Sequence, residues 1–144
     1  MKKFIKRLII LVILIIMIVA GTFIYQGYSL YKEAIEEMSI EQKIEEIKDE
    51  ATEYIKYEQL PEDYINAVIA VEDRRFFSHN GVDAISIIRA IAKDIQTRSL
   101  AEGGITITQQ LAKNVYFTQK KEMTRKIAEI FMAFEFEKEC TKEE

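Results

Sequence analysis

The sequence contains very few residues of the kinds that several protein classes require. It has a single cysteine, Cys140, and therefore cannot form an internal disulfide. With only one histidine it also lacks the Cys/His cluster that holds zinc. Repeats, Ser/Gly-rich linkers and low-complexity tracts are absent. From its 144 residues we expect one small domain rather than a large two-domain enzyme.

One long apolar run predicts a membrane-spanning helix. Leu8 to Tyr25 is apolar apart from Gly21 and Thr22, and as a helix it is about 27 Å long, close to the thickness of a bilayer core. Residues 1–7 carry four basic side chains, and little positive charge follows the run. We therefore expect a cytoplasmic tail at 1–7, an uncleaved anchor at 8–25 in the cell membrane, and an extracytoplasmic remainder. The alternative is a signal peptide, but Ile18, two positions before Ala20, fits a cleavage site poorly.

An acidic segment, residues 26–58, follows the anchor. Its apolar residues recur at alternating intervals of four and three, which is one helical stripe: Ile40, Ile44, Ile47, Ala51 and Tyr54. The pattern lasts barely two heptads, too short to favour a coiled coil. We interpret the segment as a juxtamembrane stalk or a short amphipathic helix that lies on the following domain.

Residues 59–144 predict helices and leave no stretch long enough for a sheet. Pro61, with the acids that follow it, begins a helix that ends at Glu72. A second helix follows the Asn80-Gly81 turn with Asp83 as its cap, and residues 97–104 form a loop. A third helix carries Gln109 to Val115. The fourth runs from about Thr118 with these residues facing inward: Met123, Ile127, Ile130, Phe131 and Phe134.

The stretch from Val68 to Asp83, VIAVEDRRFFSHNGVD, is where the chemistry is expected. The apolar run from Ala67 to Val71 should pack on a core and place Glu72 at a partly dry surface. A carboxylate there holds its proton more tightly, as a general acid or base near neutral pH requires. The alternative is that these are solvated charges at a helix end. We expect His79 to be hydrogen-bonded inside the loop rather than to act as a second proton carrier.

Two further blocks follow: EGGITITQQLAKN at 102–114 and RKIAE at 125–129. With EDRRFFSHNGVD they resemble glycosyltransferase family 51, the peptidoglycan glycosyltransferase domain of monofunctional transglycosylases and class A penicillin-binding proteins. The resemblance covers about residues 60–137 and three of the family's five blocks. It implies a mostly α fold, in which a single N-terminal transmembrane helix precedes a partial lysozyme-like domain at 59–144. The fourth block begins at Thr141 to Glu144, so we expect the N-terminal part of that domain and leave its activity open.

The resemblance also implies a reaction. A growing glycan on a lipid diphosphate is transferred, with inversion, to the sugar hydroxyl of the next lipid II. This needs a base for the hydroxyl proton and positive charge for the departing diphosphate. By resemblance Glu72 is the base and Glu129 the second carboxylate of the site. The residues implied in substrate binding are Arg74, Arg75, Thr106, Gln109, Gln110, Lys113, Arg125 and Lys126.

No tightly bound cofactor is expected, although Asp73 is a candidate ligand for a divalent cation, Mg²⁺ or Mn²⁺. The implied partners are lipid II, the growing glycan strand, the membrane and other wall-synthesis proteins, but not nucleic acid. Ile105 stands where the family has serine, so one hydroxyl contact is missing.

Two other functions remain open. A lysozyme-like glycan hydrolase would also use two separated carboxylates, and a non-catalytic membrane protein would only bind the lipid-linked precursor or wall-synthesis partners. The cations Lys113, Arg125 and Lys126 favour the transferase, because a hydrolase has no diphosphate to stabilise.

Overall fold

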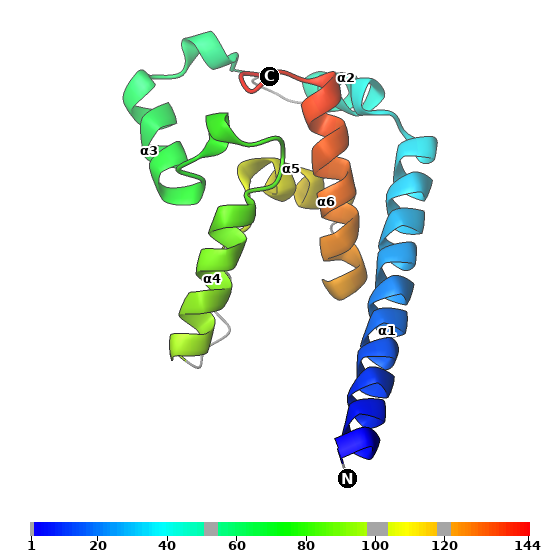
Figure 1. The fold of residues 1–144 in the computed structure, drawn as a ribbon. Helices are drawn as coiled ribbons and strands as arrows, with labels where there is room; N and C mark the ends of the chain where they lie inside the picture. The colour runs from blue at the N-terminus through cyan, green and yellow to red at the C-terminus, as the bar shows by residue number, and fades with distance from the viewer. Residues whose placement is uncertain (1, 51–54, 98–103, 118–121) are drawn as a thin grey trace.

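The computed structural model describes residues 2–50, 55–97, 104–117 and 122–144. Within these ranges the chain is helical and has no strand, which confirms the predicted mostly α fold (Figure 1). The α-helices are α1 (Lys2–Glu37), α2 (Ile40–Glu50), α3 (Glu62–Glu72), α4 (Ala84–Thr97), α5 (Ile107–Tyr116) and α6 (Glu122–Glu139). Two short 3-10 helices, η1 (Tyr57–Gln59) and η2 (Phe76–Ser78), lie before and after α3.

Helix α1 extends far from the rest of the molecule (Figure 1). It is 36 residues long and contains the apolar run from Leu8 to Tyr25, whose side chains are exposed apart from Phe23, which is half-buried. An exposed surface that is so large and apolar is stable in lipid rather than in water. It is long and apolar enough to cross a membrane, as the predicted anchor requires. The helix does not end at Tyr25 but continues without a break to Glu37.

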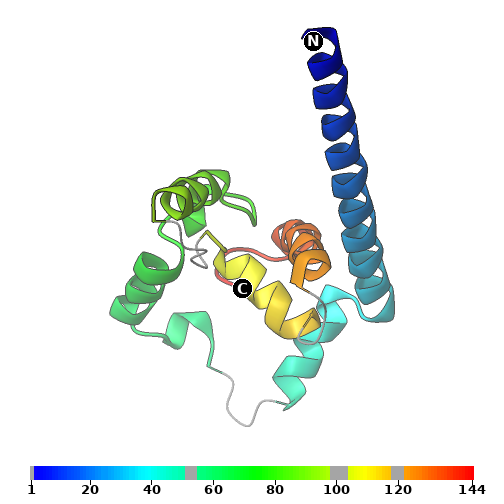
Figure 2. The same cartoon turned by 90° about the horizontal axis from the view of Figure 1, so that it is seen from below.

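The core forms where α6 packs between the C-terminal part of α1 and α5 (Figure 2). Towards α1, the ring of Phe131 stacks on that of Tyr31 with centroids 5.9 Å apart. The Tyr31 hydroxyl also donates to Glu135 Oε2 at 3.0 Å. The cluster that joins the three helices is buried and includes Ala112, Phe117, Ala128, Met132 and Phe136. Helix α6 is therefore the central element of the fold.

This central position corrects the predicted inward face of α6. Ile127, Ile130 and Phe131 are partly buried, as expected. Met123 and Phe134 are 58% and 43% exposed, so their predicted burial is wrong. The reason is that the buried face of α6 runs along Ala128, Met132 and Phe136, and Met123 and Phe134 do not lie on it.

Helix α2 lies on the domain, as the amphipathic-helix interpretation predicted. Ile40 is buried and Ile44 packs against the same core. Ser39 and Gln42 form reciprocal hydrogen bonds of 3.0 and 3.3 Å that begin the helix. The last two residues of the predicted stripe, at 51 and 54, lie outside the described residues.

Helices α3 and α4 stand apart from this core (Figure 1). Pro61 is the N-cap of α3, and Asp83 caps α4 by accepting from the Ser86 backbone N–H at 3.0 Å, so both predicted helix starts are confirmed. No residue of α3 is buried and Val71 is 80% exposed. The expectation that Ala67 to Val71 packs on a core is therefore wrong, because α3 has no core helix beside it. The expected loop at 97–104 lies mostly outside the described residues.

We predict that Phe117→Ala strongly destabilises the domain, because Phe117 is fully buried in the cluster between α5 and α6. Loss of a buried phenylalanine costs about 3–5 kcal/mol, which for a chain of this size corresponds to a fall of at least about 6 °C in the thermal midpoint. Circular dichroism of the detergent-solubilised protein measures it. Phe77→Ala, at an exposed phenylalanine, is the matched control. Equal midpoints for the two variants would contradict the assigned core.

Candidate active site

Glu72 is the last residue of α3 and is exposed to solvent. The Gln110 side chain, from the first turns of α5, donates from Nε2 to Glu72 Oε2 at 2.8 Å. The block that begins with Glu72, EDRRFFSHNGVD, and the block at 102–114, EGGITITQQLAKN, therefore meet at this carboxylate. The predicted partly dry setting of Glu72 is wrong, because the end of α3 is not packed against the core. Its exposure leaves the carboxylate accessible to a bound substrate.

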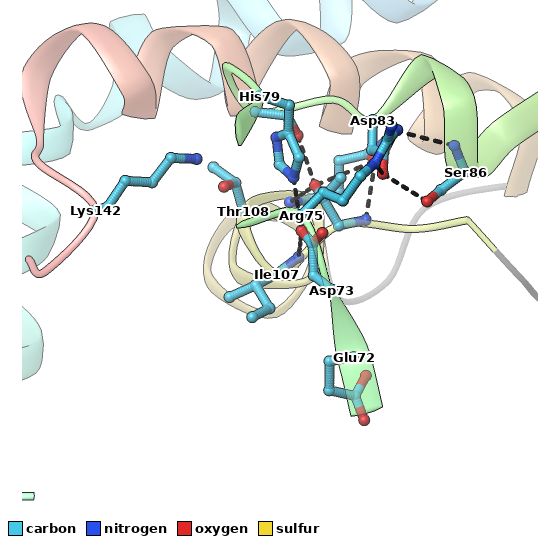
Figure 3. A network of polar contacts seen from close by, with 12 residues as sticks. Glu72, Asp73, Arg75, His79, Asp83, Ser86, Ile107, Thr108 and Lys142 are labelled. Atoms are coloured by element: carbon cyan, nitrogen blue, oxygen red, sulfur yellow. Dashed lines mark hydrogen bonds and ion pairs between the residues drawn. The ribbon is translucent and has the colours of Figure 1, made fainter. Parts of the chain in front are cut away.

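The next residue, Asp73, is buried and holds two segments together (Figure 3). Its Oδ2 lies 2.8 Å from His79 Nε2 and accepts from the Ile107 backbone N–H at 3.3 Å. The carboxylate thus lies at the N-terminus of α5, where the helix dipole favours negative charge. Through these contacts Asp73 fixes the loop, and the prediction that His79 is hydrogen-bonded inside it is confirmed.

The two arginines of the first block differ in their surroundings. Arg75 forms a fork on Asp83, with Nε donating to Oδ2 at 2.9 Å and the guanidinium NH2 group bonded to Oδ1. Asp83 is itself buried and caps α4, and the Arg75 side chain that it holds is half-buried. Arg74 is exposed, and its Nε donates to the Ala70 carbonyl at 3.0 Å. Of this pair, Arg74 is the more exposed and has no carboxylate partner among the described residues, so it is the more accessible to a ligand.

Thr106 and Gln109, both predicted to bind substrate, lie inside the cap of α5. The Thr106 hydroxyl accepts from the Gln109 backbone N–H at 3.1 Å, and Gln109 Oε1 accepts from the Thr106 N–H at 3.2 Å. The same hydroxyl donates to the Gly81 carbonyl at 2.5 Å. Both side chains are buried, so they position α5 and do not face solvent. The Thr-x-x-Gln spacing is a capping-box signature and could have indicated this from the sequence.

Gly81 makes this cap possible. Its φ is +80°, and a Cβ there would lie 2.8 Å from the Ala133 carbonyl oxygen of α6. A side chain is therefore excluded both by the backbone conformation and by the lack of space. The predicted turn at Asn80-Gly81 is confirmed and also brings the loop against α6.

A cleft of about 350 Å³ opens where the end of α3, helix α4 and the start of α5 meet. Glu72 and Arg74 line it, together with Arg89 and Lys93 from α4 and Ile105 from the second block. Arg89 and Lys93 are not among the site residues that the sequence predicts. Their spacing of four residues put them on one face, but only the fold shows that this face borders the cleft.

A second charged group lies on α5 and α6. Glu129 is buried and forms an ion pair with Arg125, one turn earlier on α6. Burial raises the pKa of Glu129, while the positive charges of Arg125, Lys113 and Lys126 act in the opposite direction. Lys113 and Lys126 are exposed. The structure therefore brings together the three cations that the sequence predicted, with Glu129 beneath them.

The described residues around Asp73 offer few side-chain ligands for the predicted divalent cation. Among the described residues no group of three or more His, Cys, Asp or Glu side chains is arranged to hold a metal ion. Asp73 Oδ2 already contacts His79 and the Ile107 N–H.

These features define a class of protein: a helical domain on a membrane anchor, with an exposed carboxylate at a cleft and clustered cations beside it. The sequence model of the transglycosylase family matches residues 39–144. The chain belongs to the transglycosylase family.

Several penicillin-binding proteins are similar to it. Penicillin-binding protein 1F of Bacillus subtilis is 43% identical over 94 residues, which are 65% of this chain and 13% of that protein. Penicillin-binding protein 1A of Aquifex aeolicus is 41% identical over 85 residues, or 59% and 12% of the two chains. For penicillin-binding protein 1A of Pseudomonas aeruginosa the identity is 40% over 90 residues, or 62% and 11%. The chain thus matches about an eighth of the length of these relatives.

We predict a pH-dependent difference in stability between the wild type and Glu129→Gln. Because burial raises the folded-state pKa of Glu129, ionisation at higher pH costs the wild type stability that the uncharged glutamine does not lose. As the pH falls through the raised pKa of Glu129 towards the ordinary glutamate value of 4.5, the wild type should gain stability relative to the variant. Denaturation at several pH values measures this. A difference that does not change with pH, or that changes in the opposite direction, would contradict the assignment.

Proposed function

We propose that this chain carries the transfer site of a peptidoglycan glycosyltransferase, which polymerises lipid II into glycan strands and releases the lipid diphosphate. Membership of the transglycosylase family supports this, as does similarity to penicillin-binding proteins. The observation that carries the proposal is the hydrogen bond from Gln110 to the exposed carboxylate of Glu72 beside the cleft. It orients a base where a substrate hydroxyl can reach it.

In the proposed reaction, Glu72 accepts the proton of the acceptor sugar hydroxyl. The hydroxyl oxygen attacks the anomeric carbon of the donor from the face opposite the diphosphate and forms the new glycosidic bond. The bond from the anomeric carbon to the diphosphate oxygen breaks, and its electron pair leaves with the diphosphate. One displacement of this kind inverts the anomeric centre.

The two groups of cations give the diphosphates a place to bind. Lys113, Arg125 and Lys126 would stabilise the negative charge that develops on the departing diphosphate. The acceptor is also lipid-linked and carries its own diphosphate, and the cleft cations Arg74, Arg89 and Lys93 would bind this second diphosphate. A hydrolase of finished glycan would need neither group.

The exposed and buried carboxylates would then have different roles. Glu72 is accessible and acts as the base. Glu129 is buried against Arg125, so it would organise the cations rather than touch the reacting hydroxyl. Thr106 and Gln109 would act by holding α5, which carries Gln110 and Lys113.

The location of the site is part of the same proposal. Basic residues precede the apolar run of α1 and few follow it directly, which supports a cytoplasmic N-terminus and an extracytoplasmic domain. The proposed partners there are lipid II, the growing glycan strand and other wall-synthesis proteins.

We predict that Glu72→Gln lowers the rate of glycan polymerisation about 10²- to 10⁴-fold, the usual effect of losing a general base. Binding of the lipid-linked donor should change little, because the amide keeps the shape but accepts no proton. Polymerisation of purified lipid II in vesicles measures the rate. Glu62→Gln, in the first turn of the same helix, is the control and should leave it unchanged. Near-normal polymerisation by Glu72→Gln would assign the base to another residue.

We predict that Lys113→Ala and Lys126→Ala each weaken binding of a water-soluble, short-chain lipid diphosphate about tenfold, the size of one charge-assisted hydrogen bond. Added salt should weaken wild-type binding, because both lysines are exposed. Lys138→Ala, on the exposed surface near the end of α6, is the matched control. Calorimetric titration measures the affinity. If the wild type and a variant that combines Lys113→Ala with Lys126→Ala bind the ligand equally, these two lysines are not part of the diphosphate site.

A further inference from the structure

Helix α3 has no buried residue, so the position of Glu72 depends on the loop that follows the helix. This loop contains η2, whose first residue, Phe76, donates its backbone N–H to the Asp73 carbonyl at 3.0 Å. Asp73 ties the loop to the start of α5, but its bond to the Ile107 N–H is long, at 3.3 Å. A second set of contacts reaches the same two segments from the end of α6.

The second set centres on Glu137, in the last turn of α6. Its Oε1 accepts from Thr108 Oγ1 of α5 at 2.7 Å and from Lys142 Nζ at 2.6 Å. The Lys142 side chain points from the segment after α6 towards Thr108 (Figure 3). Its Nζ also lies 4.3 Å from the centre of the Phe76 ring in η2. We call Phe76, Thr108, Glu137 and Lys142 the Glu137 clamp, which joins η2, α5 and α6.

The charged pair of the Glu137 clamp is largely withdrawn from solvent. The side chains of Lys142 and Glu137 are 17% and 14% exposed. Burial of an ion pair is unfavourable unless further bonds satisfy both groups, and removal of one partner leaves the other unpaired. Here the carboxylate has two donors, and the ammonium lies over an aromatic ring, whose face attracts a cation. Loss of the Lys142 charge would therefore remove the link to Phe76 and leave Glu137 with Thr108 alone.

Phe76 connects the Glu137 clamp to the buried part of the loop. Its ring lies edge-on to that of His79, with the centroids 6.3 Å apart. His79 Nε2 in turn lies 2.8 Å from Asp73 Oδ2. The clamp and Asp73 thus hold the same loop through different residues, and Glu72 directly precedes Asp73 in the chain.

We propose that Glu137 and Lys142 are positioning residues for Glu72. By holding η2 against α5 and α6, they keep the end of α3 where Gln110 can form the hydrogen bond that orients Glu72. Both residues line a cavity other than the cleft that contains Glu72, so they act through the loop and not on the substrate. The role of Glu72 as a base rests on the proposed function, but the clamp itself does not.

Hydrogen exchange of the detergent-solubilised full chain, measured by mass spectrometry, tests the clamp without any substrate. Lys142→Met keeps the length of the side chain but removes its charge, so amides in the peptide at 73–79 should exchange about tenfold faster. Lys142→Arg keeps a charge that can bond to Glu137 and lie over the ring, and should restore nearly the wild-type rate. Lys138→Met, which removes an exposed ion pair on the same helix, is the matched control and should leave the loop unchanged.

The peptide at 128–136, in the buried part of α6, separates a local effect from general unfolding. Its exchange should be the same in the wild type and in Lys142→Met. Equal loop exchange in these two proteins, or equal acceleration of the loop and of the α6 peptide, would overturn the proposal.

A double-variant comparison tests the ring contact. In a Phe76→Leu background, Lys142→Met should accelerate loop exchange much less than it does in the wild type, because both changes remove the same contact. An undiminished acceleration would exclude the contact with Phe76 as the link to the loop and would also overturn the proposal.

The kinetics of lipid II polymerisation measure the effect on Glu72. Lys142→Met should lower kcat about tenfold and leave KM near the wild-type value, because a misplaced base slows the chemical step while the binding residues stay in place. Lys142→Arg should recover most of the rate. A normal kcat in Lys142→Met would overturn the positioning of Glu72. If the wild type does not polymerise lipid II, the proposed function fails, while loop exchange still decides whether the clamp holds the loop.

Discussion

The buried carboxylate of Asp73 is the contact on which the rest of the candidate site depends. It bonds to His79 in the loop after α3 and to the backbone N–H of Ile107 at the start of α5 (Figure 3). Glu72 precedes it directly, and Gln110 lies one turn into α5. The hydrogen bond that orients Glu72 therefore requires the two segments to stay where Asp73 holds them. A buried carboxylate is costly unless its oxygens are bonded, which is why the loop and the helix start satisfy it together.

Helix α6 connects this site to the membrane anchor. One side of the helix packs on α1 through Ile127 and Phe131, and its buried Ala128 and Met132 belong to the cluster shared with α5. The same helix carries Glu129 and its cations. A central helix of this kind would keep the charged groups in a constant position relative to the anchor, as the proposed lipid-linked substrate requires.

Local signals in the sequence predicted the helices well, because a cap such as Pro61 or Asp83 acts within a few residues. Exposure was harder to predict. The apolar run before Glu72 suggested burial, yet no residue of α3 is buried, and Val71 remains exposed. Which helices meet is a property of the whole fold. For the same reason Arg89, on the polar side of α4, could not be assigned to the cleft from the sequence. The motif residues themselves were identified by resemblance, and their geometry came from the structure.

The most direct test of the central claim is to count the products formed when the protein acts on lipid-linked disaccharide in vesicles. The account predicts that one lipid diphosphate is released for each new glycosidic bond, because the acceptor hydroxyl displaces the diphosphate. It also predicts that no reducing sugar is released from finished glycan. Release of reducing sugar from finished glycan, without release of lipid diphosphate, would contradict the account and identify a hydrolase.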